Sequence, residues 1–137
     1  MSARFAVGRV SGEVGELILL IVINNVSDLD VYVMSMDLLK KIYDFTNKLP
    51  RSELSTQDQI RRASKSIPAN IAEGFAKKIS SKEFKRFLTI SLGSSDEVVT
   101  HLKMVEIIVP QMGIDATNLE NEFIILSKRI NKLRSCW

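Results

Sequence analysis

The chain has 137 residues, of which 45% are apolar and 26% are charged, and these fractions are ordinary for a single globular domain. Its one cysteine, Cys136, excludes an intramolecular disulfide, and with the one histidine, His101, it argues against a metal centre. We therefore expect no metal and no cofactor, and this cysteine usage fits the reducing cytoplasm.

The first 27 residues differ in pattern from the rest of the chain. Three glycines precede an apolar run from Leu17 to Ile23, which is too short to span a bilayer. Arg4 and Arg9 before the run imitate a signal peptide, but no small-x-small cleavage site follows. We expect residues 1–27 to be a poorly packed extension, or a product of translation from an upstream start codon. A cleaved signal and an added strand are the weaker alternatives, and no contact with a membrane is expected.

From Asp28 onward the apolar residues recur with the period of a helix. The pattern predicts helices over about 29–48, from 52–56 to 76, and from 80 or 81 to 109, and a fourth that reaches Trp137. Pro50, Pro110 and Gly113 stand between them as breakers. Ser80 and Glu83 have the spacing of a capping box, and Gly74 suits the end of the second helix.

The third and fourth predicted helices carry seams of apolar or small residues at alternating spacings of four and three, as in helices packed nearly antiparallel. The seam of the third helix consists of Phe84, Leu88, Ser91, Ser95, Val98, Leu102, Val105 and Val109. With short connections, the pattern predicts an all-α, up-down-up-down antiparallel four-helix bundle over residues 28–137.

The second and third helices also carry small residues where they should face each other. Such residues allow two backbones to approach closely or leave room for a polar network. If the chain turns back near residues 78–80, Arg62 lies level with Glu97, and Glu73 lies level with Phe84 and Lys85. We therefore predict an Arg62–Glu97 ion pair, and a buried pair of this kind adds little net stability.

The most specific motif runs from Gln59 to Phe75 and has Pro68 well inside a helical pattern, where a proline removes a backbone hydrogen bond. This motif, continued through 81–84, 86–88 and 90–97, resembles the bacterial four-helix-bundle family of 23S rRNA intervening-sequence proteins. The resemblance covers roughly residues 29–134. The chain departs from it at Val99 and His101, where the family often has glutamate and glutamine. The family-type structural positions are Arg62, Pro68, Asn70, Glu73, Gly74 and Glu97.

The resemblance implies a homo-oligomer, commonly a pentamer, and a link to nucleic acid, because relatives are encoded inside rRNA intervening sequences. Distant relatives are accessory proteins of diversity-generating retroelements and act with a reverse transcriptase. It implies no enzymatic reaction. Glu73 and Glu97 suggest a general acid–base pair only formally, since no nucleophile motif or phosphate-binding glycine loop accompanies them.

The net charge is only +3, but the basic residues gather in two segments. One lies between residues 51 and 86, and the second contains Lys128, Arg129, Lys132 and Arg134. Such clusters attract phosphate backbones or an acidic partner, although each of the two basic clusters is also typical of a solvated helix face. The predicted nucleic-acid contacts are Arg61, Lys65, Lys77, Lys78, Lys82, Lys85 and Arg86.

Two functional hypotheses follow from the sequence. The first is a non-catalytic homo-oligomer that associates with RNA or DNA through its basic surfaces. The alternative is an oligomeric adaptor that binds a protein such as a reverse transcriptase or a nuclease.

Overall fold

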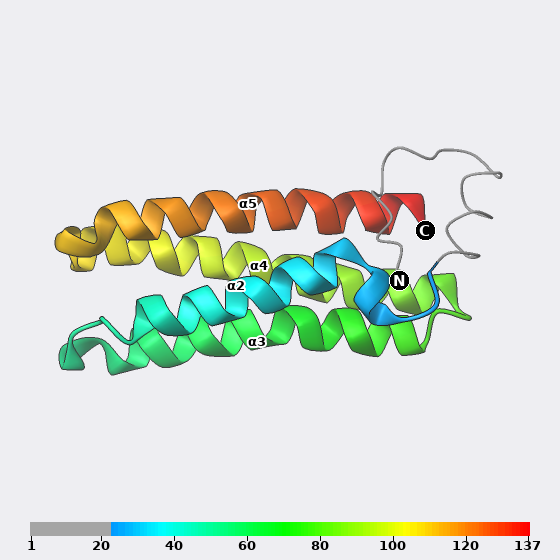
Figure 1. Cartoon of the computed structure of the whole chain (residues 1–137), viewed down its shortest axis with the longest axis horizontal. Coiled ribbons are helices and arrows are strands. Elements are labelled where there is room, and N and C mark those ends of the chain that lie inside the picture. The colour runs from blue at the N-terminus through cyan, green and yellow to red at the C-terminus, as the bar shows by residue number, and fades with distance from the viewer. Residues whose placement is uncertain (1–22) are drawn as a thin grey trace.

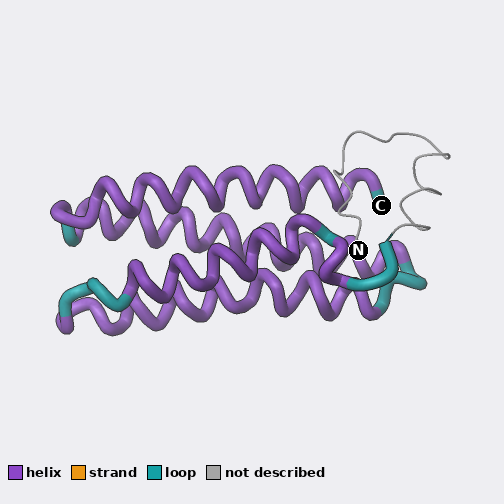
Figure 2. The backbone as a smooth tube through the Cα atoms, viewed as in Figure 1, coloured by secondary structure: helices purple, strands orange, loops and turns teal. Residues whose placement is uncertain are grey.

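The computed structural model describes residues 23–137, which form an antiparallel four-helix bundle (Figure 1). The long helices are α2 (Asp30–Thr46), α3 (Leu54–Ala76), α4 (Ser81–Ile108) and α5 (Gly113–Cys136). Three short 3-10 turns lie at their N-terminal sides: η1 (Val26–Asp28), η2 (Arg51–Glu53) and η3 (Pro110–Met112). Figure 2 shows that short loops join successive helices at alternate ends, and the predicted all-α bundle is confirmed.

Among the described residues, no helix is both long enough and apolar enough to cross a bilayer.

The predicted helix boundaries differ from the observed ones by only a few residues. Pro50 lies between α2 and α3, and Pro110 opens η3 directly after α4. Ser80 caps α4 as expected, because its hydroxyl accepts the Glu83 backbone N–H at 3.2 Å. Glu83, however, turns its carboxylate to Arg86 at 2.9 Å. The observed cap is therefore the Ser80 half of the capping box.

The core runs along the axis between the four helices. All eight residues of the predicted α4 seam are buried, and α5 contributes Leu119, Phe123, Leu126, Ile130 and Leu133. α4 packs against both α3 and α5, and α2 completes the bundle against α3 and α5. The seam pattern thus identified the buried face correctly.

The core also includes Ile23, which the sequence had assigned to a poorly packed extension. This side chain is 3% exposed. The backbone N–H groups of Asn24 and Asn25 both donate to the buried carboxylate of Asp28 at 3.0 Å, so the entry into α2 is fixed locally. The packed part therefore begins before residue 28, while residues 1–22 of the expected extension lie outside the described residues.

Gly74 lies within α3 and its role is close packing. A Cβ atom added there would lie 2.6 Å from Cβ of Phe87 and 3.1 Å from a ring carbon of Phe84. Because real Cβ atoms do not approach so closely, only glycine at position 74 allows α4 to pack this close to the backbone of α3. The sequence correctly placed Gly74 near the end of the helix, but it did not indicate that this glycine is needed for close packing against α4.

The small residues between α3 and α4 form a polar network. The hydroxyl of Ser91 donates to the carbonyl of Ile67 at 3.0 Å, next to Pro68. Further out, the hydroxyls of Ser66 and Ser94 lie 2.9 Å apart, and the Asn70 amide donates to the Ser66 carbonyl at 2.8 Å. Both expected uses of small residues, close approach and polar contact, therefore occur at this interface.

Candidate nucleic-acid interface

The turn between α3 and α4 is built on an aromatic cluster. Phe75, which ends the apolar face of α3, meets Phe84 edge to face with ring centroids 6.1 Å apart. Phe84 in turn contacts Trp137, the last residue of the chain, at 4.7 Å. Because Trp137 follows α5, this contact holds the C-terminal end of α5 beside the α3–α4 turn.

Basic side chains cover this aromatic cluster. The Lys78 ammonium lies 4.2 Å from the centroid of the Phe75 ring, and Lys77 and Arg86 lie 4.8 and 4.5 Å from that of Phe87. Such cation–π contacts position the charges but leave them available to solvent. Five of the predicted nucleic-acid contacts, from Lys77 to Arg86, are therefore gathered at one end of the bundle.

Two of these cations are partly neutralised by acidic neighbours. Lys77 pairs with Glu73 at 3.7 Å, and Arg86 pairs with Glu83 at 2.9 Å. The hydrogen bond from Arg86 lowers the pKa of Glu83, and the same bond raises the pKa of Arg86. All four side chains are substantially exposed, so these pairs contribute little stability.

The basic cluster of α5 runs from the middle of the bundle toward the same end. Since α5 runs antiparallel to α4 (Figure 1), the last two turns of α5 lie beside the first turns of α4. Lys128 lies further from that end, because the hydroxyl of the adjacent Ser127 contacts Ser95 and Asp96 in the middle of α4. A direct link is the Arg134 guanidinium, which donates to the Thr89 hydroxyl at 3.1 Å. The sequence showed this second cluster but did not join it to the first, because about 50 residues separate them along the chain.

Five lysines of these two segments (residues 77–86 and 128–134) have no acidic side chain within 4 Å among residues 23–137. They are Lys78, Lys82, Lys85, Lys128 and Lys132. We call them the unpaired lysines. Lys82 lies exposed in the first turn of α4, Lys85 is half-buried, and Lys128 and Lys132 are exposed one turn apart on α5.

Arg61 and Lys65 lie away from this end, about 18 Å or more from Lys77 along α3 at 1.5 Å per residue. Arg61 holds the end of α2: it donates to Thr46 Oγ1 and Asn47 Oδ1, both at 2.8 Å, and stacks 4.2 Å from the Tyr43 ring centroid. Lys65 is exposed. The structure thus separates these two predicted contacts from the other five.

The predicted Arg62–Glu97 pair is present, with Nη2 2.9 Å from Oε2. Its side chains are 67% and 38% exposed, so the pair is a surface pair and not a buried one. Glu97 Oε2 also lies 3.2 Å from Nε2 of His101. Glu73 and Glu97 have different basic partners, and nothing in this arrangement supports general acid–base chemistry between them.

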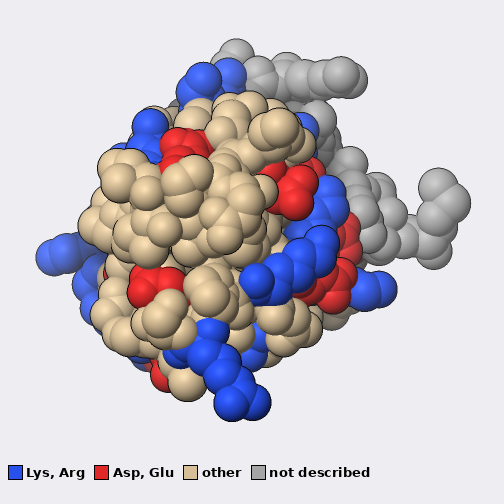
Figure 3. Space-filling view, turned by 90° about the vertical axis from the view of Figure 1, so that its left-hand side faces the viewer, with Lys and Arg blue, Asp and Glu red and all other residues tan. Residues whose placement is uncertain are grey.

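The opposite end of the bundle has a different surface. Ile107 and Ile114, where α4 passes into α5, are 81% and 82% exposed, and Met104 and Ile108 are also exposed. Figure 3 views this end and shows an uncharged surface over much of its upper half. The α3–α4 turn also exposes one large apolar side chain, Ile79, but the phenylalanines beside that turn are buried.

A carboxyl pair lies between α4 and α5 near this apolar end. Glu120 is 6% exposed, and burial, with the neighbouring carboxylate of Glu106 as a second cause, raises its pKa to about 7. Glu106 accepts a hydrogen bond from the Thr117 hydroxyl, and its contact with Glu120 is the main reason that its pKa is lowered. Lys103, 3.9 Å from Glu120, only partly offsets the burial. Burial and the neighbouring Glu106 carboxylate thus favour the protonated form of Glu120, and a neutral carboxyl group is tolerated in the interior.

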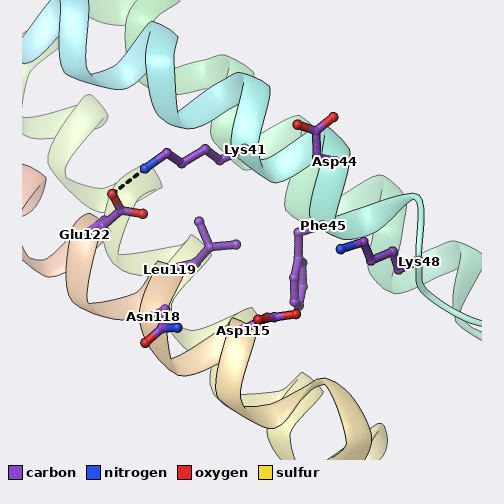
Figure 4. Close-up of a pocket in the computed structure, with 8 residues that line it drawn as sticks. All are labelled: Lys41, Asp44, Phe45, Lys48, Asp115, Asn118, Leu119 and Glu122. Carbon is purple, nitrogen blue, oxygen red and sulfur yellow. Dashed lines mark hydrogen bonds and ion pairs between the residues drawn. The ribbon is translucent and has the colours of Figure 1, made fainter.

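A hollow of about 280 Å³ separates α2 from α5 toward this end (Figure 4). Phe45 and Leu119 form its floor, and Lys41 on α2 bridges it to Glu122 on α5 at 2.7 Å. The remaining charged lining residues are Asp44, Lys48 and Asp115. Three carboxylates against two lysines give this hollow no attraction for phosphate, which distinguishes it from the basic end.

Within residues 23–137, no three histidine, cysteine or carboxylate side chains are arranged to hold a metal ion.

Comparison with known protein families accounts for nearly all of this architecture. The family model of the 23S rRNA-intervening sequence proteins matches residues 27–132, which include the whole of the first three long helices and most of α5. The chain belongs to this family. No curated protein matches it. The resemblance inferred from the Gln59–Phe75 motif is confirmed, and the 23S rRNA-intervening sequence protein family is not known as enzymatic.

Proposed function

We propose that this 23S rRNA-intervening sequence protein is a non-catalytic, homo-oligomeric bundle that associates with RNA or DNA through its basic end. The observation that carries the proposal is the group of five unpaired lysines, which two distant segments of the chain supply to the basic end and to the adjoining part of α5. Lysines without acidic partners release counterions when they meet phosphates, and this release favours binding to any polyanion.

A salt titration with a labelled 20-nucleotide strand tests nucleic-acid association. If the lysines contact phosphates, the logarithm of the association constant falls linearly with the logarithm of salt concentration, by about 0.7 per contact on a single strand. Replacing two contacts in the variant Lys82→Gln/Lys85→Gln should therefore reduce the slope by about 1.4. Lys40→Gln/Lys48→Gln removes the same charge from exposed positions on α2 and in the turn that follows it, and should leave the slope unchanged.

A wild-type affinity that does not respond to salt would overturn the proposal. Equal slopes for the two double variants would also do so, because they would show that only the net charge matters.

The exposed apolar end supports the homo-oligomeric part of the proposal, for which the family resemblance suggests five copies. Exposed isoleucines and a methionine that cluster at one end are typical of surfaces that another chain covers. Ile107→Lys/Ile114→Lys should lower the native mass measured by sedimentation while leaving the helical circular dichroism unchanged. A wild-type protein that sediments as a monomer would contradict the oligomer.

A protein partner with an acidic surface is the alternative ligand of the basic end. It would be favoured if the wild-type protein bound no nucleic acid at low salt but bound a reverse transcriptase or nuclease encoded by a neighbouring gene, with an affinity that falls as salt is added.

A further inference from the structure

A small hollow lies on the outer surface of α5, beside the first turn of α2. It has a volume of about 180 Å³, and it is lined by Asp30, Ile125, Lys128, Arg129 and Lys132. This volume holds several water molecules but is below the range of pockets for drug-sized ligands. It therefore suits one small polar unit of a larger molecule.

The charges around this hollow favour an anion. Lys128 and Lys132 lie one turn apart on α5 and have no acidic side chain within 4 Å among the described residues. No aspartate or glutamate follows Glu122 in the chain. Since Asp30 is the only acidic lining residue against three cations, the hollow keeps an excess of positive charge.

Asp30 gives the hollow a second chemical property. Its Oδ2 lies 3.6 Å from Nη1 of Arg129, which is an ionic contact too long for a hydrogen bond. Its Oδ1 is sealed from solvent, so it cannot meet a ligand. Oδ2 has only this ionic contact with Arg129, and a carboxylate oxygen can accept two hydrogen bonds, so Oδ2 has unused acceptor capacity beside a cationic surface.

A phosphate next to a hydroxyl donor satisfies both properties, and in a polymer that combination is the sugar–phosphate unit of RNA. We propose that the hollow binds one ribonucleotide unit of a single RNA strand. Lys128, Lys132 and Arg129 contact the phosphate, and the ribose 2′-hydroxyl donates to Oδ2 of Asp30. Because DNA lacks this hydroxyl, the site makes the protein prefer RNA to DNA. The inference rests on the proposed nucleic-acid association and extends the basic end along α5.

The test compares two 20-nucleotide strands, oligo(rU) and oligo(dU), which differ only in the 2′-hydroxyl. The wild-type protein should bind oligo(rU) about fivefold to tenfold more tightly, as one hydrogen bond to a charged acceptor allows. Asp30→Ala should bring this ratio close to one. Asp37→Ala removes the same charge from an exposed position of α2 and should leave the ratio unchanged.

The α5 lysines are tested on both strands. Lys128→Gln/Lys132→Gln should reduce the salt slope by about 1.4 for oligo(rU) and for oligo(dU) alike. Thermal unfolding of each variant checks that the bundle remains intact, and the ratio between strands does not depend on the fraction of folded protein.

The outcomes separate this inference from the function on which it rests. Equal affinity for the two strands, or a ratio that Asp30→Ala does not change, overturns the ribonucleotide site while nucleic-acid association stands. The same holds if Lys82→Gln/Lys85→Gln reduces the slope and Lys128→Gln/Lys132→Gln does not. Failure of the wild-type protein to bind either strand at low salt overturns the association itself, and the ribonucleotide site with it.

Discussion

The two ends of the bundle differ in the side chains that cover the core and in those that face solvent. At the α3–α4 turn, the aromatic residues Phe75, Phe84 and Trp137 pack on one another, and basic side chains lie over Phe75 and the nearby Phe87. At the α4–α5 connection, Ile107 and Ile114 remain exposed, and the buried carboxyl group of Glu120 lies beside that of Glu106 between the helices. The first end presents mainly charge, although Ile79 in the α3–α4 turn is fully exposed, whereas the second presents mainly apolar surface. The proposed function assigns attraction of polyanions and association with other chains to opposite ends of one bundle.

The largest expected effect tests whether the aromatic cluster closes the basic end. Phe84 is fully buried, so Phe84→Ala should destabilise the protein by about 3–5 kcal/mol through lost burial and a cavity. Ile107→Ala, at the other end, removes an apolar side chain that is 81% exposed and should change stability by at most about 0.5 kcal/mol. Urea unfolding measures both. Similar losses for the two variants would show that the ends do not differ in this way.

A second substitution tests the close approach of α3 and α4 beneath the basic end. Gly74→Ala places a methyl group 2.6 Å from Cβ of Phe87, and overpacking of this kind costs about 1–3 kcal/mol. Gly93→Ala is the matched control on α4, because no atom lies within 4 Å of the added Cβ. It should stabilise the protein by about 0.5–1 kcal/mol through helix propensity. The prediction fails if both variants melt at or above the wild-type temperature.

The carboxyl pair near the apolar end predicts a dependence of stability on pH. Burial raises the pKa of Glu120 from an ordinary 4.5 to about 7, so the folded protein binds this proton more tightly than the unfolded chain does. The resulting stabilisation is complete below pH 4.5 and is lost as the pH rises through about 7. Glu120→Gln keeps a neutral side chain there at every pH. Its melting temperature should therefore rise relative to that of the wild type between pH 5 and pH 8.5, by about 10 °C.

Melting curves of the two proteins recorded across this pH range provide the measurement. A difference in melting temperature between wild type and Glu120→Gln that stays constant with pH would show that the proton bound by Glu120 does not contribute to the packing of α4 against α5.

The smallest effect concerns the ion pair between the two ends. Arg62 and Glu97 are both well exposed, so a double-mutant cycle with Arg62→Gln and Glu97→Gln should give a coupling energy of about 0.2–1 kcal/mol. Added salt should reduce it further. A coupling above 2 kcal/mol would mean that another chain covers this pair in the assembled protein.

Much of the fold was readable from local patterns along the chain. The four-and-three seam of α4 named its buried face residue by residue, and Pro50, Ser80 and Pro110 marked where helices stop or start. These features act within a few turns of one helix, so the sequence displays them directly. The Arg62–Glu97 pair was also predictable, because a short turn fixes which residues of two antiparallel helices lie level.

Only part of the candidate site could be predicted from the sequence. The residues from Lys77 to Arg86 are close together along the chain, and their common location followed from the turn. The approach of Lys132 and Arg134 to that end, with Lys128 nearer the middle of the bundle, depends on the path of α5 and on the contact between Trp137 and Phe84. Arg61 is the opposite case: its charge suggested phosphate binding, and only the structure shows that its guanidinium also contacts Thr46, Asn47 and Tyr43.

The sequence by itself therefore determined the helices, their buried faces and the family, because periodicity, caps and motif residues are local properties. The tertiary structure decided which charges are neutralised and which remain unpaired, and it placed Asp30 beside the cations of α5. Ion pairing depends on distances of a few ångströms between residues far apart in the chain, and only the packed bundle sets those distances.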